Sequence, residues 1–196
     1  MLKKMRGFTL IEMLIVVAII GILAALLIPN AMSALQKAKQ KGTVKDINTI
    51  AVGIMDYVTD KGNVPAHAGP VQANDTLVSS LQGFYLKVFP VNDQWGNPYQ
   101  VDTREQANST WAIAYADGAE LGDDEFVVGS FGRDGSQGPD YDYNVDDPTA
   151  GLYEVNTMKD FNEDIVNWNG SMVIGPRTAA GAATGGAGGT GGETGT

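Results

Sequence analysis

The sequence predicts an α+β fold in which one long N-terminal helix packs on a small antiparallel β-sheet. Three observations predict this fold: an unbroken apolar stretch near the amino terminus, an amphipathic continuation of that stretch, and several short strand-forming segments separated by turn residues. The chain has 196 residues, of which 43% are hydrophobic and 18% charged, a composition that suits one globular domain with appendages.

The helix is expected to begin with a segment long enough to cross a membrane. From Phe8 to Ile28, 21 residues carry a single formal charge, that of Glu12. A helix rises about 1.5 Å per residue, so this segment spans roughly 30 Å, the thickness of a bilayer core. The basic cluster in the first seven positions favours a plain signal anchor with its amino terminus inside.

Glu12 does not suit a plain anchor. A carboxylate costs about 2.5–3.5 kcal/mol at the centre of a membrane segment and less near its end, and such a group usually has a partner. Either Glu12 sits shallow in the membrane interface, or it pairs with a positive group on a neighbouring chain. A cut before Phe8 would create an α-amino group four residues from Glu12, on the same helical face.

Residues 7–12, with the sequence GFTLIE, resemble the cleavage and methylation motif of the family of type IV pilins and type II secretion pseudopilins. The resemblance implies that a prepilin peptidase cuts between Gly7 and Phe8 and methylates the Phe8 amine. It implies that Glu12 neutralises the amine of the next subunit during assembly. It also implies that Pro29 accompanies a kink, or a local melting of the helix back toward Gly21, in the filament.

The same resemblance implies a function and a set of partners. The chain is expected to form a homopolymer, a type II secretion pseudopilus or a type IV pilus-like filament, on an inner-membrane assembly platform. It would cross the inner membrane once before assembly and lie in a periplasmic or cell-surface filament afterwards. The alternative is a monomeric, membrane-tethered calcium-binding or adhesive module. Neither class is an enzyme, and the lone His67, in a Gly/Pro-rich loop, is expected to be a surface residue.

The second half of the helix is expected to be amphipathic and to run to about Asp60, ending at 61–63. It carries one apolar stripe at helical spacing, formed by Ile47, Ile50, Ala51, Ile54 and Val58. This stripe should pack on the sheet. Four lysines precede it: Lys37, Lys39, Lys41 and Lys45. We favour a solvated face beside the membrane for these lysines over a specific binding patch.

The globular part is expected to hold a short helix at 76–82 and three strands. The strand candidates are 98–102, 109–117 and 125–131, separated by Gly, Asp and Pro turn signals. Three short strands in sequence suggest an antiparallel meander, covered on one face by the amphipathic half of the long helix.

Residues 94–101, QWGNPYQV, resemble a segment of the major pseudopilins within this family. Trp95 and Tyr99 are expected to fill the core or an interface, and Gly96 and Pro98 to shape the turn. In those relatives the segment precedes a calcium loop, whose two halves 130–138 and 163–168 resemble.

The resemblance therefore implies a structural calcium site. Calcium takes about six to eight oxygen ligands in flexible geometry, which suits carboxylates and carbonyls. The implied ligands are Asp134 and Asp164, then Glu163, with the carbonyl of Ser130. The stretch between the two halves is much longer than is usual in the family, so its acidic residues either supplement the site or displace it. The reserve ligands there are Asp140, Asp142, Asp146 and Asp147. Alternatively, all of these acids are solvated loop charges.

Charge and composition set limits on function. The formal net charge is −10, and without Lys3, Lys4 and Arg6 the remaining 10 basic and 23 acidic residues give −13. Such an acidic domain argues against nucleic-acid binding, which requires basic residues. The absence of cysteine excludes disulfides and thiolate chemistry.

The expected organisation has four parts. Residues 1–7 form a leader peptide, 8–29 the transmembrane and assembly helix, and 30–177 the globular domain with the rest of the long helix. Residues 178–196 form a disordered tail, because 8 of these 19 residues are glycine and none is aromatic or large and apolar.

Overall fold

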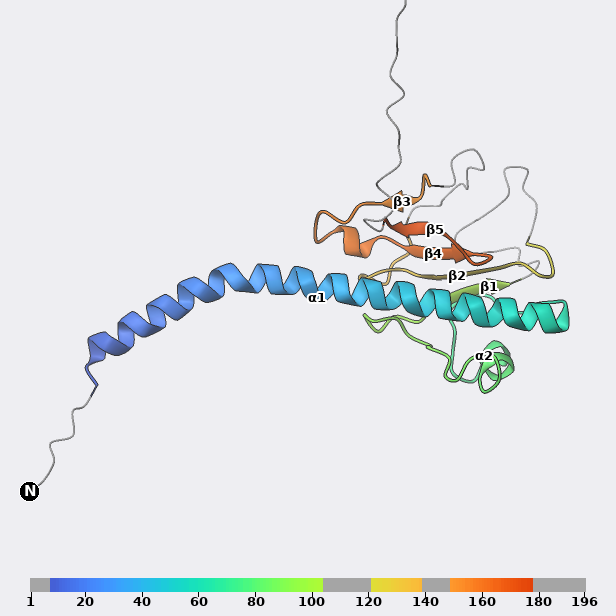
Figure 1. Ribbon diagram of the computed structural model, residues 1–196, viewed down its shortest axis with the longest axis horizontal. Coiled ribbons are helices and arrows are strands. Elements are labelled where there is room, and N and C mark those ends of the chain that lie inside the picture. The colour runs from blue at the N-terminus through green and yellow to red at the C-terminus, as the bar shows by residue number, and fades with distance from the viewer. Residues whose placement is uncertain (1–7, 104–120, 139–148, 178–196) are drawn as a thin grey trace, which may run out of the picture.

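The computed structural model describes residues 8–103, 121–138 and 149–177. A single helix, α1 (Leu10–Lys61), forms the spine of the molecule, and its C-terminal half lies along one face of a sheet (Figure 1). Its N-terminal half extends away from the globular domain. A short helix, α2 (Thr76–Leu81), lies on the other side of α1 from the sheet (Figure 1).

Local chemistry defines both ends of α1. Thr9 is the N-cap, and Gly62 is the C-cap, with a left-handed φ of 78° that favours glycine. The predicted start and end of the helix are therefore confirmed to within two residues. The helix runs without a break through Pro29, and Figure 1 shows α1 curving between its free half and its packed half.

The sheet has five strands, in the order β1-β2-β4-β5-β3. Their bounds are β1 (Gln100–Thr103), β2 (Phe126–Ser130), β3 (Leu152–Tyr153), β4 (Ile165–Trp168) and β5 (Ser171–Pro176). The pairs β1–β2, β2–β4 and β4–β5 are antiparallel, and β3 pairs in parallel with β5. A 3-10 turn, η1 (Asp160–Asn162), precedes β4.

The α+β class is confirmed, but the meander needs correction. The strand candidates around 98–102 and 125–131 correspond to β1 and β2, whereas 109–117 lies outside the described residues. The sheet is mixed rather than wholly antiparallel, because β3 joins its edge through a parallel pairing. Residues 163–168, expected as part of a loop, contain β4, a strand in the middle of the sheet.

The core lies between α1 and the sheet. The predicted stripe supplies Ile47, Ile50, Ala51 and Ile54, all buried, while Val58 packs at its edge. The sheet and its flanking segments supply Tyr99, Val101, Phe126, Val128 and Ile165. Buried apolar surface stabilises a fold by about 25 cal/mol per Å², so burial of this stripe helps to hold the helix on the sheet.

Two glycines within α1 allow neighbouring segments to approach closely. A Cβ at Gly42 would lie 2.8 Å from Gln94 Cγ, and one at Gly53 would lie 2.6 Å from Leu86 Cγ. Glycine suits these two helix positions because any larger side chain would push away the chain segments that pack against α1 there.

Candidate assembly and metal sites

The N-terminal half of α1 exposes its apolar side chains. Leu10, Ile11, Leu14, Ile22 and Leu26 are each more than half exposed, although they belong to the most apolar part of the chain. This is the one helix among the described residues that is long and apolar enough to cross a membrane. A face of this kind requires a lipid or protein environment, because the chain itself does not cover it.

Glu12 forms a capping box at the start of this apolar helix. Its Oε2 accepts hydrogen bonds from the Thr9 backbone N–H and the Thr9 hydroxyl, both at 2.8 Å, and the Glu12 N–H donates to Thr9 Oγ1 at 3.3 Å. The carboxylate therefore satisfies donors of the first helical turn in the single chain. Sequence reasoning missed this second role of Glu12, although the Thr-x-x-Glu spacing signals it.

The residues expected to be processed stand beside this box. Phe8 is 81% exposed, one position before Thr9, and Gly7 lies outside the described residues. Both hydrogen bonds that Glu12 accepts within the described residues end on Oε2. The other carboxylate oxygen, Oε1, is therefore open to a donor from another chain.

Asp93 organises the turn that follows it. Its Oδ1 accepts the backbone N–H groups of Trp95, Gly96 and Asn97 at 2.8–2.9 Å, and its Oδ2 accepts the Ser130 hydroxyl at 2.6 Å. Sequence reasoning missed Asp93. The signal that could have identified it is an aspartate two residues before a Trp-Gly-Asn turn, because aspartate readily accepts from the N–H groups that follow it.

The turn also attaches to α1. Trp95 Nε1 donates to Gln36 Oε1 at 2.7 Å, and the hydroxyl of the fully buried Tyr99 donates to Asp46 Oδ2 at 3.3 Å. Gly96 adopts a φ of 100°. The structural roles expected for Trp95, Gly96 and Tyr99 are confirmed.

The structure brings the two halves of the expected calcium loop together. The Arg133 N–H donates to the Phe161 carbonyl at 2.8 Å, and the Gly138 N–H donates to Asp164 Oδ2 at 3.0 Å. The backbone at Gly132, with φ 68°, passes so close to Glu163 that a Cβ would lie 2.6 Å from the Glu163 carbonyl oxygen.

The expected ligands have different environments within this junction. Asp164 is buried, whereas the Asp134 carboxylate is exposed and accepts the Ser136 N–H at 3.1 Å. Glu163 is exposed, and the hydroxyl of the buried Ser130 is committed to Asp93. The reserve aspartates at 140–147 lie outside the described residues.

Carboxylates alone do not form a metal cage here. Within the described ranges, no group of three acidic or histidine side chains is arranged to hold an ion. The side-chain oxygen Oδ1 of Asn162 is buried without a hydrogen-bond donor among the described residues. A cation at this junction would therefore depend on amide and carbonyl oxygens in addition to Asp164 and Asp134.

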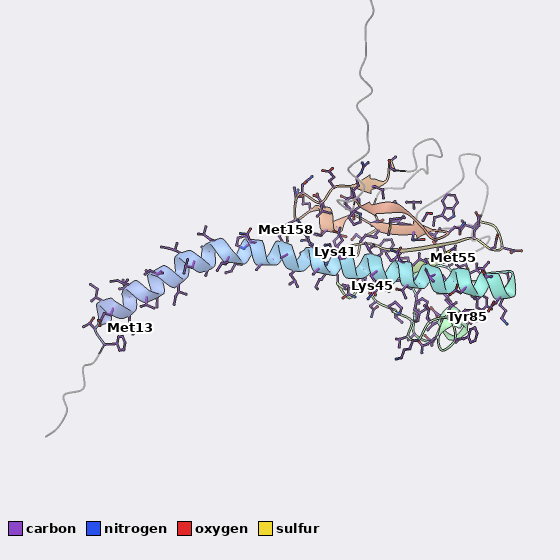
Figure 2. All side chains as sticks on the ribbon, in the orientation of Figure 1. Met13, Lys41, Lys45, Met55, Tyr85 and Met158 are labelled. Carbon is purple, nitrogen blue, oxygen red and sulfur yellow. The ribbon has the colours of Figure 1, made fainter. Side chains whose placement is uncertain are left out.

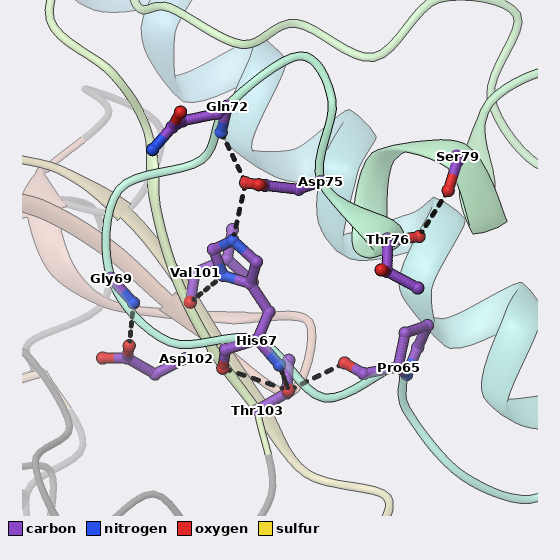
Figure 3. Close-up of polar contacts among 10 residues, drawn as sticks. All are labelled: Pro65, His67, Gly69, Gln72, Asp75, Thr76, Ser79, Val101, Asp102 and Thr103. Carbon is purple, nitrogen blue, oxygen red and sulfur yellow. Dashed lines mark hydrogen bonds and ion pairs between the residues drawn. The ribbon is translucent and has the colours of Figure 1, made fainter.

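His67 is a structural residue rather than the surface residue expected. Its Nδ1 lies 2.8 Å from the Val101 carbonyl and its Nε2 lies 3.0 Å from Asp75 Oδ2 (Figure 3). The Gln72 N–H and then His67 hold the pKa of the Asp75 carboxyl below its ordinary value. His67 thus fastens the loop before α2 to β1, and both of its ring nitrogens are engaged.

Comparison with known proteins gives two family matches. Residues 2–28 match the prokaryotic N-terminal methylation motif, and residues 30–146 match the type II secretion system (T2SS) protein G family. No solved structure matches the chain at a significant level.

Several curated relatives share one description, type II secretion system core protein G. The Vibrio cholerae protein is 31% identical over 158 residues, which cover 74% of this chain and 99% of the relative. The Pseudomonas aeruginosa protein is 40% identical over 108 residues, or 50% of this chain and 73% of the relative, and the Aeromonas hydrophila protein is 37% identical over 109 residues with the same coverage.

Proposed function

Because this chain belongs to the type II secretion system protein G family, we propose that it is a pseudopilin, the repeating structural subunit of a secretion filament. The observation that carries the proposal is the free N-terminal half of α1, which is apolar, exposed on all sides and headed by the Thr9–Glu12 capping box. This segment suits a membrane before assembly and the helical core of a filament afterwards.

Maturation precedes assembly in this proposal. The methylation motif at 2–28 supports a cut by prepilin peptidase between Gly7 and Phe8, followed by methylation of the Phe8 amine. The cut removes the basic leader and leaves Phe8, exposed at the start of α1, as the new terminus.

Glu12 then directs polymerisation. The positive Phe8 amine of an incoming subunit binds the Glu12 carboxylate of its neighbour, at the Oε1 atom that the capping box leaves open. An unpaired charge is costly in apolar surroundings. An axial offset between neighbouring subunits that pairs the Phe8 amine with Glu12 is therefore favoured over offsets that leave either charge unpaired. The partners are copies of the same chain, prepilin peptidase and an inner-membrane assembly platform. The filament forms on the periplasmic side.

Calcium is the structural ion we propose for the junction of 130–138 with 160–164. Asp164 and Asp134 would supply carboxylates and Ser130 and Glu163 further oxygens, with Asn162 Oδ1 as an additional buried acceptor. A hard, oxygen-seeking cation fits such a mixed donor set better than a transition metal does. When bound, it would fasten the loop after β2 to the segment before β4. The chain has a structural rather than a catalytic role in this proposal.

The filament assignment is tested with Glu12→Gln beside Glu12→Ala. Glutamine keeps an oxygen that can accept from Thr9 but removes the charge, so it separates helix capping from charge pairing. We expect both variants to enter the membrane and to be cut after Gly7, as intact mass would show, but to lose filaments in electron micrographs.

Glu154→Gln is the matched control, because it removes the same charge from an exposed position of the globular domain. Its filaments should be normal. Normal filaments from Glu12→Gln would refute charge pairing. A wild-type chain that keeps residues 1–7 and forms no filaments would favour the monomeric tethered module.

A further inference from the structure

A groove runs along the exposed face of α1, beside the loop that follows α2. It is open to solvent, has a volume of about 590 Å³, and lies between the face of α1 from Lys41 to Val52 and the loop residues Tyr85 and Leu86. Figure 2 shows Tyr85 on the loop below α1, opposite the sheet. We call this feature the α1 groove.

The far wall of the α1 groove is held in place by several contacts. The Tyr85 hydroxyl donates to Asp60 Oδ2 at 3.1 Å, and its ring packs edge-on against Tyr57 and Phe84, with centroids 5.3 and 4.8 Å away. Leu86 is buried against Gly53, which has no side chain to hold it off. The groove is therefore a preformed feature of the free subunit.

The chemistry of the α1 groove is apolar with a basic edge. Val52 on its floor is 56% exposed, and Phe84 and Val88 on the adjoining loop are 82% and 69% exposed. Lys41 and Lys45 are one helical turn apart on its rim, and neither forms an ion pair with a described residue. Exposed apolar side chains rimmed by polar residues mark interaction sites, and the basic rim here stands out on a chain whose net charge is −10.

We propose that the α1 groove receives the acidic globular surface of a second copy of this chain. The inference rests on the proposed function. In a filament, the α1 helix of a neighbouring subunit would lie parallel to residues 8–29. Its C-terminal half would then run beside the packed half of this α1, which would bring the neighbour's globular domain next to the groove. After the cut the chain carries 23 acidic and 10 basic residues, so a neighbouring copy offers the complementary charge.

Membrane lipid is a poorer occupant on grounds of distance. Lys45 lies 17 residues beyond Ile28, which is about 25 Å of helix above the bilayer core. The headgroup layer extends roughly 6 Å beyond the core on each side. Lipid phosphates therefore do not reach the rim of the groove when 8–28 spans the membrane.

The first test is charge reversal in the full-length chain. Lys45→Glu should lower filament yield about tenfold or more, because it sets like charges against each other across the contact. Lys159→Glu changes the net charge equally at an exposed position outside the groove, and it should leave the yield unchanged. Normal filaments from Lys45→Glu, in cells where Glu12→Gln makes none, would overturn this inference while leaving the proposed function intact.

The second test does not depend on how well a charge variant folds. The chain has no cysteine, so Thr49→Cys places a single thiol at the groove, where a benzophenone probe can be attached. Irradiation of assembled filaments should give a covalent dimer, with the probe joined to an acidic peptide of the globular domain. The Glu12→Ala background should give no dimer. Attachment only to lipid, to another protein or within the same chain would overturn the proposal.

Discussion

At the scale of single residues, Asp93 shows how one buried carboxylate can join a turn to the end of a strand. It gathers the N–H groups of the turn at 95–97 and the hydroxyl of Ser130 at the end of β2. Asn97 completes the link, because its Nδ2 donates to the Gly132 carbonyl at 2.9 Å. The turn, α1 and the proposed calcium junction are therefore connected through neighbouring hydrogen bonds.

Asp93→Ala should destabilise the globular domain strongly. The substitution leaves the N–H groups of Trp95 and Asn97 and the buried Ser130 hydroxyl without their acceptor, whereas the Gly96 N–H keeps the carbonyl of residue 93. An unsatisfied buried donor costs about 1–3 kcal/mol. We expect a loss of roughly 3 kcal/mol or more in the free energy of unfolding, measured by urea denaturation. Asp124→Ala, which removes an exposed carboxylate before β2, is the control. Equal midpoints for the two variants would contradict the role given to Asp93.

At the scale of secondary-structure elements, α1 has two halves with different partners. Its packed half is buried against the sheet by an apolar stripe and lies against the segment 84–89 at Gly53, whereas its first half has no partner in the chain. The continuous helix transmits the position of one half to the other. Capping by Thr9 and Gly62 at its two ends keeps this single element intact.

Gly53→Ala tests the close approach to α1. Alanine favours a helix by about 1 kcal/mol over glycine, but an extra methyl group in a packed site costs about 1–3 kcal/mol. Because the new Cβ would meet the buried Leu86, we expect a net loss of stability and a lower melting temperature. Gly42→Ala meets the exposed Gln94 side chain, which can move, so it should be nearly neutral. A gain in stability from Gly53→Ala would show that the loop adjusts freely.

At the scale of the whole molecule, the proposed ion would join the middle of the sheet to the loop beside it. If calcium binds only the folded chain, stability rises by about 2.7 kcal/mol at a hundredfold excess over Kd. Magnesium should substitute poorly, because it requires a tight octahedron and loses water reluctantly. Melting the fragment from Asn30 onward with calcium, magnesium or chelator measures this effect.

The calcium-dependent rise in melting temperature should be lost in Asp164→Ala and reduced in Asp134→Ala. Asp124→Ala, outside the junction, should keep it. Identical melting curves with calcium, magnesium and chelator would show that the long stretch between the two halves has replaced the family's metal site. The carboxylates would then be ordinary loop charges.

Much of this protein was predictable because the signals are local. The apolar run, the stripe from Ile47 to Ile54 and the glycine at position 62 define α1 through neighbours within a few turns. The GFTLIE motif likewise needs only six adjacent residues, and the family match at 2–28 agrees with it. The turn at 95–97 and strands β1 and β2 were also predictable from local residue preferences.

Tertiary structure alone decided the features that join distant segments. Four features depend on residues far apart in sequence. They are the position of β4 in the sheet, the parallel pairing of β3, the contact of 130–138 with 160–164, and the groove between α1 and Tyr85. His67 and Asp93 gained their roles in the same way, from acceptors and donors that only the fold brings near. The sequence by itself determined the helix, its apolar N-terminal half and the match to the methylation motif, because periodicity, capping and short motifs act over a few residues. Strand order and buried polar contacts follow from how the whole chain packs, and no local pattern encodes them.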